Sequence, residues 1–371
     1  MKKIQLIIAM ILSLLIVSCT QNQSAEPIRI GALFPLTGGL ATYGEAALTS
    51  AQMAAEEINA AGGINGKPVE IDFQDHQCDP KIALAAFQEL HLAKGIKVFT
   101  SAACSGTVLA IAPTLVSGDA IIVGTIVTTP KITGVSPYLF RNWASDAKQA
   151  KLYADEVKKH GYKKIGIIFE QTDYAAGLKT GLVNSLNGSN IQVASESFDP
   201  GTTDVRTQLS KLKDANVDML FVSPQTESSG DIILKQMQEL GFGPKALFVN
   251  DNVLKMQSLM MRYKTLLQGA TSADYVLEDS IAHKAFLGKY RSKYGKECIH
   301  TNICAGVYDA VHVLAQAIRE KGENPSGIRE YLQSVHYTGV SGTFGFDANN
   351  DRTNAEYTLF TAKDGKAVRV K

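Results

Sequence analysis

The sequence predicts an α/β protein with two parallel β-sheets, each covered on both faces by helices. Three observations carry this prediction: strand and helix patterns alternate through most of the chain, the strands are short runs of buried apolar residues, and the alternation falls into two series. With 371 residues, the chain has room for about two domains. No low-complexity linker separates the series, so we expect short, ordered crossings between the two halves.

The first series opens with the apolar strand pattern at 28–34. The helix that follows carries Ala, Met and Ile on one face, and it stops at Gly62-Gly63, since glycine is the usual residue just past a helix end. The same alternation then repeats. We expect strands at 28–34, 69–73, 96–101 and 120–124, and helices at 44–61, 81–94 and 105–117.

The second series has the same βα character and begins with a helix. We expect helices at 147–160, 174–186, 205–214 and 228–240, and strands at 164–169, 191–197, 219–223 and 246–250.

The amino terminus has the pattern of an export signal. Lys2 and Lys3 precede an apolar run at 4–17, which is too short for a permanent membrane span. The segment 15–19 resembles the bacterial lipobox, which implies a signal peptide at 1–18, cleavage before Cys19 and lipid on Cys19. An ordinary cleaved signal with an incidental cysteine is the alternative. We expect the chain in the cell envelope, in the periplasm or on the outer face of the cytoplasmic membrane, held to the membrane by this lipid.

The charge balance excludes polyanionic partners. Without residues 1–18 the chain has 353 residues, with 35 Lys+Arg against 36 Asp+Glu, a net charge of −1. The basic residues form no stripe or block, so nucleic acid is not an expected partner. We expect a monomer.

Four further cysteines remain: Cys78, Cys104, Cys298 and Cys304. An even number in an exported chain indicates disulfides, and three pairings are possible. Short separations favour Cys78 with Cys104 and Cys298 with Cys304. A metal site using Cys298, His300 and Cys304 is the alternative, but this spacing matches no common zinc pattern, so we expect no metal.

Four motifs resemble the branched-chain amino-acid (Leu/Ile/Val-binding) type of periplasmic solute-binding protein, here in lipoprotein form. They are GALFPLTG at 31–38, EINAAGGINGK at 57–67, DHQCDP at 75–80 and CSGT at 104–107, together with Tyr43-Gly44. The resemblance implies a type I periplasmic-binding fold: two Rossmann-like lobes joined by a three-crossing hinge, with the ligand between them. Lobe one would hold 26–147 and 275–340, and lobe two 148–274 and 341–371. The family's disulfide joins the positions that match Cys78 and Cys104.

Candidate binding residues in lobe one lie where expected strands end. Ser105 opens a helix, whose free N–H groups and partial positive charge suit a carboxylate. A plain N-cap role is the alternative. The resemblance assigns the ligand carboxylate to Ser105, and it assigns the α-amino and α-carboxylate ends to the carbonyl near Val127 and the hydroxyl of Thr128. It also implies that Tyr43 packs on the ligand side chain.

The candidates in lobe two are Tyr174, Asp251 and Thr226. The resemblance implies that the Tyr174 ring closes over the ligand and that Asp251 binds the ligand ammonium. The alternatives are a tyrosine of the core and an aspartate that caps a helix. The segment 223–227, which contains Thr226, is polar where the branched-chain pattern is aromatic. This difference favours a ligand that is not purely aliphatic.

No catalytic or nucleotide-binding motif occurs in the chain, so we expect no enzyme and no cofactor. The resemblance implies the solute-binding protein of an ABC importer, which binds an amino acid, branched-chain or related, and delivers it to an ABC permease in the inner membrane. The alternative function is a ligand-sensing receptor for an amide, urea or aromatic carboxylate.

Overall fold

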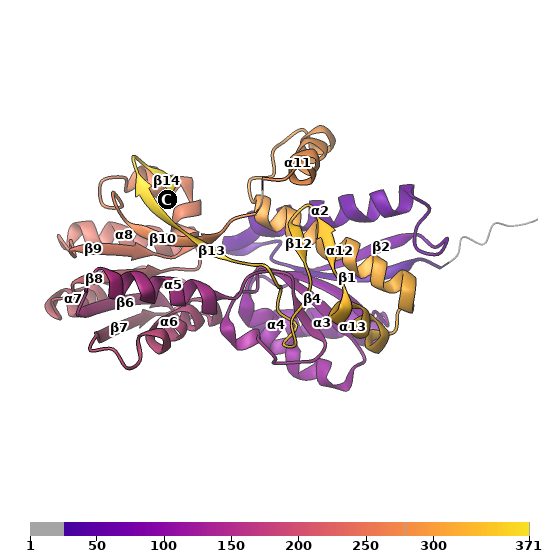
Figure 1. Cartoon of the computed structure of the whole chain (residues 1–371), viewed down its shortest axis with the longest axis horizontal. Coiled ribbons are helices and arrows are strands. Elements are labelled where there is room, and N and C mark those ends of the chain that lie inside the picture. The colour runs from indigo at the N-terminus through magenta and orange to yellow at the C-terminus, as the bar shows by residue number, and fades with distance from the viewer. Residues whose placement is uncertain (1–25, 278, 371) are drawn as a thin grey trace, which may run out of the picture.

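The computed structural model describes residues 26–277 and 279–370, and it confirms an α/β protein of two lobes (Figure 1). The predicted signal peptide 1–18 and Cys19 lie outside these residues. Lobe one is built on a five-stranded parallel sheet in the order β2-β1-β3-β4-β5. Its strands are β1 (Ile28–Phe34), β2 (Val69–Asp75), β3 (Val98–Ala102), β4 (Ile121–Thr125) and β5 (Leu139–Arg141).

Lobe two is built on a seven-stranded sheet in the order β14-β13-β10-β9-β8-β6-β7. Strands β6 to β10 run parallel, whereas β13 is antiparallel to both β10 and β14. The bounds are β6 (Lys164–Glu170), β7 (Gln192–Phe198), β8 (Met219–Ser223), β9 (Ala246–Val249), β10 (Thr271–Tyr275), β13 (Tyr357–Lys363) and β14 (Lys366–Arg369).

Helices cover both faces of each sheet. In lobe one α2 and α12 cover one face and α3 and α4 the other, and each face has its own apolar core. In lobe two α5 and α6 cover one face and α7 to α10 the other. The bounds are α2 (Ala41–Ala60), α3 (Pro80–Gln88), α4 (Ser105–Ile111), α5 (Asp146–Lys159), α6 (Asp173–Leu186), α7 (Arg206–Asp214), α8 (Glu227–Glu239), α9 (Asp251–Lys255), α10 (Gln257–Arg262), α11 (Ile281–Tyr294), α12 (Thr301–Lys321) and α13 (Pro325–Ser334).

Two predicted helices change type before they end. The helix expected at 81–94 is α3 followed by a π-helical segment, η3 (Glu89–Ala93). The helix expected at 105–117 is α4 followed by a 3-10 segment, η4 (Ala112–Ser117), because Pro113 has no N–H to continue the α-helical ladder. Short 3-10 segments also occur at η2 (Gly38–Leu40) and η5 (Pro130–Ile132).

The chain passes between the lobes after β5, after β10 and before β13. One boundary differs from the expected change of lobe at residue 341. The hairpin of β11 (Tyr337–Gly339) and β12 (Gly342–Phe344) lies on lobe one, because Phe344 and Phe346 pack in the core under α12. The last crossing therefore lies between β12 and β13.

Candidate functional site

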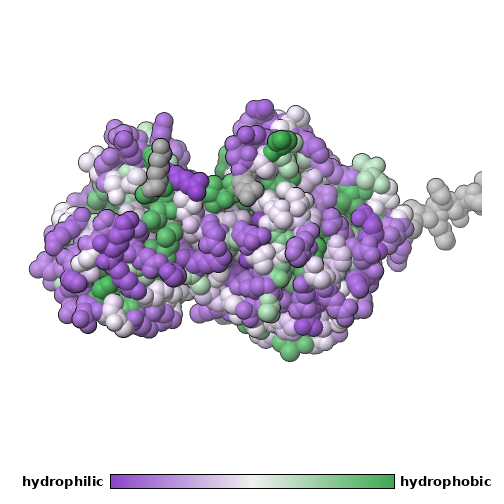
Figure 2. Space-filling model, in the orientation of Figure 1, coloured by the Kyte–Doolittle hydropathy of each residue, from purple (hydrophilic) through white to green (hydrophobic). Residues whose placement is uncertain are grey.

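A pocket lies between the lobes, at the carboxyl ends of the parallel strands, where open α/β sheets bind their ligands. In the space-filling view the two lobes are separate masses joined at a narrower waist (Figure 2). The pocket holds about 510 Å³ of empty space, solvent at its mouth included. Lobe one supplies Tyr43, Cys104, Ser105, Ile126, Thr128 and Trp143, and lobe two supplies Tyr174, Gln225, Asp251, Asn252, Asp274 and Tyr357.

The lobe-one wall is formed by two strained loops. Ala103 and Cys104, which follow β3, have φ of 60° and 55°, and Ile126, which follows β4, has φ of 54°. This left-handed region costs a non-glycine residue of order 1–3 kcal/mol, and such strain is concentrated at functional sites. The Ala103 N–H donates to the Thr125 carbonyl at 2.9 Å, which helps to hold the first loop against the second.

Ser105 and Thr128 come together on this wall, as predicted from their positions after neighbouring strands. The Ser105 Oγ accepts hydrogen bonds from the backbone N–H groups of Thr128 (3.0 Å) and Thr129 (3.2 Å). Ser105 is almost fully buried and is the first residue of α4, so its side chain is not the N-cap. Since its oxygen already accepts two bonds, its hydroxyl proton is the group left to donate.

Val127 was expected to contribute its backbone carbonyl to the site. Its side chain is fully buried in the core between the sheet and α3–α4, and it does not line the pocket. Its carbonyl accepts from Arg141 Nη1 at 3.3 Å, beside the carbonyls of Thr128 (2.9 Å) and Thr129 (3.0 Å). A carbonyl oxygen has two lone pairs, so Arg141 does not exclude a second donor, and the assignment of this carbonyl to a ligand amine stays a prediction.

Asp251 lies on the opposite wall and is the centre of a hydrogen-bond network. The helix α9 is capped by Asn250, which accepts from the Val253 N–H, so Asp251 is not needed as a cap. Asp251 Oδ1 accepts from the Tyr174 hydroxyl at 2.9 Å and from Gln149 Nε2 at 3.1 Å. Tyr174 and Asp251 thus meet directly, as two of the predicted site residues.

Lys255 bridges Asp251 to a second carboxylate, Asp274 in β10. Its Nζ lies 2.9 Å from Asp251 Oδ2 and 2.8 Å from Asp274 Oδ1. Burial opposes ionisation of Asp251, but the Lys255 charge lowers the pKa of Asp251 below its ordinary value. Burial raises the pKa of Asp274 to about 6 in spite of Lys255. Neither Lys255 nor Asp274 was expected at the site, because an (i, i+4) Asp–Lys pair in sequence reads as a surface helix pair.

A third carboxylate, Asp146, lies behind the pocket at the first crossing. Its N–H donates to the Thr128 carbonyl at 2.8 Å, and its Oδ1 accepts from the Tyr357 hydroxyl at 3.1 Å. Burial raises the pKa of Asp146 to about 7, and the charge of Asp251 adds to the effect. Asp146 therefore joins both lobes and sits in a setting that disfavours its charge.

The raised pKa of Asp146 predicts a specific pH dependence of stability. The folded chain binds this proton more tightly than the unfolded chain, whose carboxyl titrates near 3.8, so this stabilisation is complete below pH 4 and is lost as the pH rises through 7. An Asp146→Asn variant should lack this loss. The free energy of unfolding of this variant, relative to that of wild type, should rise by a few kcal/mol between pH 4 and pH 8, at about 1.4 kcal/mol per pKa unit. Urea unfolding across this range measures it, with the exposed Asp279→Asn as control; parallel curves for wild type and Asp146→Asn would contradict the assignment.

Tyr43 and Thr226 were predicted to lie near the side chain of the ligand, and the structure places them differently. Tyr43 lines the pocket and stacks on His300, with ring centroids 3.9 Å apart. Thr226 does not line it: its Oγ1 caps α8 by accepting from the Ser229 N–H. The preceding residue, Gln225, lines the pocket, so a ligand role for Thr226 stays a prediction.

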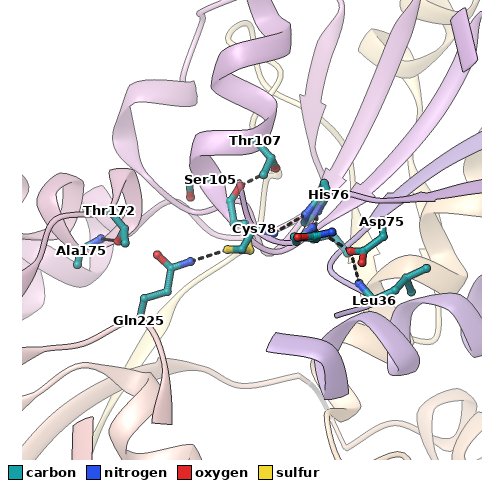
Figure 3. The surroundings of a disulfide bond; sticks show 12 residues. Leu36, Asp75, His76, Cys78, Ser105, Thr107, Thr172, Ala175 and Gln225 are labelled. Carbon is teal, nitrogen blue, oxygen red and sulfur yellow. Dashed lines mark hydrogen bonds between the residues drawn. A yellow bond between two sulfur atoms is a disulfide. The ribbon is translucent and has the colours of Figure 1, made fainter. Parts of the chain in front are cut away.

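Both expected disulfides are present, and one of them forms part of the pocket wall. Cys78 pairs with Cys104, and the Gln225 Nε2 of lobe two lies 3.1 Å from the Cys78 Sγ, so this contact crosses between the lobes (Figure 3). Cys298 pairs with Cys304, which removes both sulfurs from the alternative metal site. Within residues 26–277 and 279–370, no group of three or more His, Cys, Asp or Glu side chains is arranged to hold a metal ion.

Several pocket residues had no signal in the sequence. Trp143, the only tryptophan of the chain, lies in the first crossing and meets the Tyr275 ring edge-on at 4.7 Å. Tyr357 enters from the third crossing. Crossings between lobes carry no periodic pattern, so the sequence did not single out these residues.

A family profile described as "Periplasmic binding protein" matches residues 27–367. The chain belongs to the periplasmic binding protein family. Its relatives include the "Leucine-, isoleucine-, valine-, threonine-, and alanine-binding protein" of Pseudomonas aeruginosa, 25% identical with 94% of both chains covered. Another is the "Leu/Ile/Val-binding protein" of Escherichia coli strain K12, 25% identical over 92% of this chain and 94% of the relative.

Solved structures of this family share the fold. The leucine-binding protein LivK of Thermotoga maritima superposes with a TM-score of 0.81 at 24% identity, covering 93% of this chain and 98% of that one. LivJ of Streptococcus pneumoniae, solved with isoleucine, gives 0.76 at 26% identity, with 93% and 100% covered. A solute-binding protein of R. palustris, solved with 4-hydroxybenzoate, gives 0.79 at 20% identity, with 93% and 96% covered.

The described part of this periplasmic binding protein contains no helix that is both long and apolar enough to cross a membrane.

Proposed function

We propose that this chain is the extracytoplasmic solute-binding protein of an ABC importer and that it binds an α-amino acid, branched-chain or related, between its lobes. The observation that carries the proposal is the opposition of two unlike walls across one pocket. Ser105 and Thr128 on lobe one offer hydroxyl groups to a carboxylate. Asp251 and Asp274 on lobe two offer carboxylates to an ammonium group.

The charge of the pocket region supports a ligand that carries an amine. Asp251 and Asp274 share one lysine, Lys255, so this pair of acids carries a net negative charge when both are ionised. A buried carboxylate is costly unless a cation meets it. An α-ammonium would supply that cation, whereas a benzoate or a neutral amide would not.

The middle of the pocket supports a side chain that is small or partly polar. Tyr43, Ile126 and Trp143 give apolar surface, while Gln225 and Asn252 add amide groups. One relative is named for binding threonine and alanine as well as leucine, isoleucine and valine.

The proposal places the mature chain in the cell envelope, anchored through lipid on Cys19, with an ABC permease as its partner. The export pattern at 1–19 and the family's transport role support this location. Loss of ligand uptake in cells that lack the chain would support an importer. Intact uptake with loss of a cellular response would support the sensing alternative.

A thermal-shift screen tests the ligand class. We expect one or more of the twenty amino acids to raise the melting temperature, since a ligand at 100 times its Kd adds about 2.7 kcal/mol of stability. The des-amino analogue of each active compound should give little shift. The screen also includes 4-hydroxybenzoate, urea and simple amides, and a shift confined to these would reject the amino-acid assignment.

A further inference from the structure

We propose that the ε-ammonium of Lys255 competes with the ligand amine for Asp251 and Asp274, so that Lys255 must give up at least one of these carboxylates when the amine binds. Lys255 is then an internal competitor that sets affinity and selects ligands by their cationic group. This inference rests on the proposed function, because it names how the same pocket treats the ligand amine.

The geometry of Lys255 is that of a bound ammonium. Its Nζ is within 2.9 Å of one oxygen of Asp251 and within 2.8 Å of one oxygen of Asp274. The remaining oxygen of Asp251 is taken by Tyr174 and Gln149, at 2.9 and 3.1 Å. Each Asp251 oxygen therefore already has a donor. Lys255 lines the adjoining cavity and reaches Asp251 Oδ2 from there, so a ligand amine that approaches from the pocket competes with it for this oxygen.

Lys255 weakens the attraction of Asp251 for a second ammonium group, even though Asp274 leaves the two acids with one negative charge in excess. Two ammonium groups at one carboxylate repel each other, and this repulsion is strong where water is excluded. A ligand amine gains the full attraction of Asp251 only when Lys255 has moved away. The neighbouring Tyr43 and His300 carry no positive charge at neutral pH that would compete in the same way; burial lowers the pKa of His300 to about 4.

A second cavity gives Lys255 a place to go. It adjoins the ligand pocket, shares Tyr43, Ile126, Asp251, Asn252 and Asp274 with it, and holds about 670 Å³ of empty space, open solvent included. Lys255 lines this cavity, and its side chain is 30% exposed. Lys255 is also the last residue of α9, so its side chain can swing away without disturbing a helix interior.

Two probes test the proposal, on wild type, Lys255→Met, Lys255→Gln and the control Lys211→Met. Lys211 lies in the same lobe and pairs with one carboxylate, Glu196, away from the pocket. Calorimetric titration with L-leucine should give a Kd about tenfold lower for Lys255→Met than for wild type, since the competing charge is gone. Its des-amino analogue, 4-methylpentanoate, should show no such gain. If Lys255 had only a structural role, the Lys255→Met change would not tighten binding of L-leucine while leaving its des-amino analogue unchanged.

Methylammonium chloride, compared with sodium chloride at equal concentration, is the second probe. It should raise the melting temperature of both Lys255 variants and leave wild type and Lys211→Met unchanged, because only an emptied ammonium site can take it. No shift in either Lys255 variant would overturn the proposal, and so would weaker leucine binding by Lys255→Met. If methylammonium acts as expected but no amino acid binds any form, the proposed function fails while the assignment of Lys255 stands.

Discussion

An Asp251→Asn variant is expected to bind its amino-acid ligand at least about 30-fold more weakly than wild type. Removing one partner of a buried charged contact costs about 2–5 kcal/mol, because the other charge stays unpaired, and each 1.4 kcal/mol is a factor of ten. Asparagine keeps the shape and can still accept from Tyr174, so the loss reports the charge rather than a cavity. Isothermal titration with the amino acid selected in the thermal-shift screen measures it.

The matched control for this experiment is Ser105→Ala. It should weaken binding less, since Ser105 is uncharged and Thr128 still lines the lobe-one side of the pocket. The des-amino analogue should bind wild type poorly and should differ little between wild type and Asp251→Asn. Equal affinity of Asp251→Asn and wild type for the amino acid would show that the ammonium lies elsewhere.

An Arg141→Met variant is expected to lose about 3–5 kcal/mol of stability, the usual cost of breaking a buried ion pair from one side. Arg141 is fully buried, and its Nη2 lies 2.6 Å from Asp351 Oδ1. Its Nη1 donates to the carbonyls of 127–129, so the same side chain holds the loop that carries Thr128. Urea unfolding, read by circular dichroism, gives the loss.

The comparison for Arg141→Met is Arg262→Met. Arg262 pairs with Asp231 on the surface, where its side chain is 58% exposed, so its removal should cost under about 1 kcal/mol. Adding Asp351→Asn to Arg141→Met should recover part of the loss, because the unpaired carboxylate is then removed. Similar losses in the two arginine variants would mean that Arg141 does not hold these segments together.

Local patterns were sufficient for most of the fold up to residue 250. The apolar runs of β1, β3 and β4 and the glycines after α2 act through near neighbours, so they can be read without the rest of the chain. Beyond residue 250 the elements depend on distant partners. Helix α12 is buried along most of its length between α2 and the sheet, so it lacks the polar face that marks a surface helix.

The residues of the candidate site also fall into those that local sequence could predict and those that it could not. Ser105 and Thr128 follow neighbouring parallel strands of one sheet, whose carboxyl ends lie at one edge, so their meeting was predictable. Gln225 and Thr226 differ by one position in a tight turn, and only the three-dimensional path decides which side chain faces the pocket. Lys255 and Asp146 gain their importance from burial and from carboxylates far away in sequence, which no single segment displays.

The two ends of the described chain belong to different lobes: β1 opens the sheet of lobe one, and β14 forms the edge of the sheet of lobe two. If the amino terminus is fastened to a membrane and the lobes close on a ligand, lobe one is the stationary body and lobe two the swinging one. The carboxyl terminus then travels with the swinging body. A dye placed there, paired with one near residue 26, would turn each capture of ligand into an optical signal without any label in the pocket.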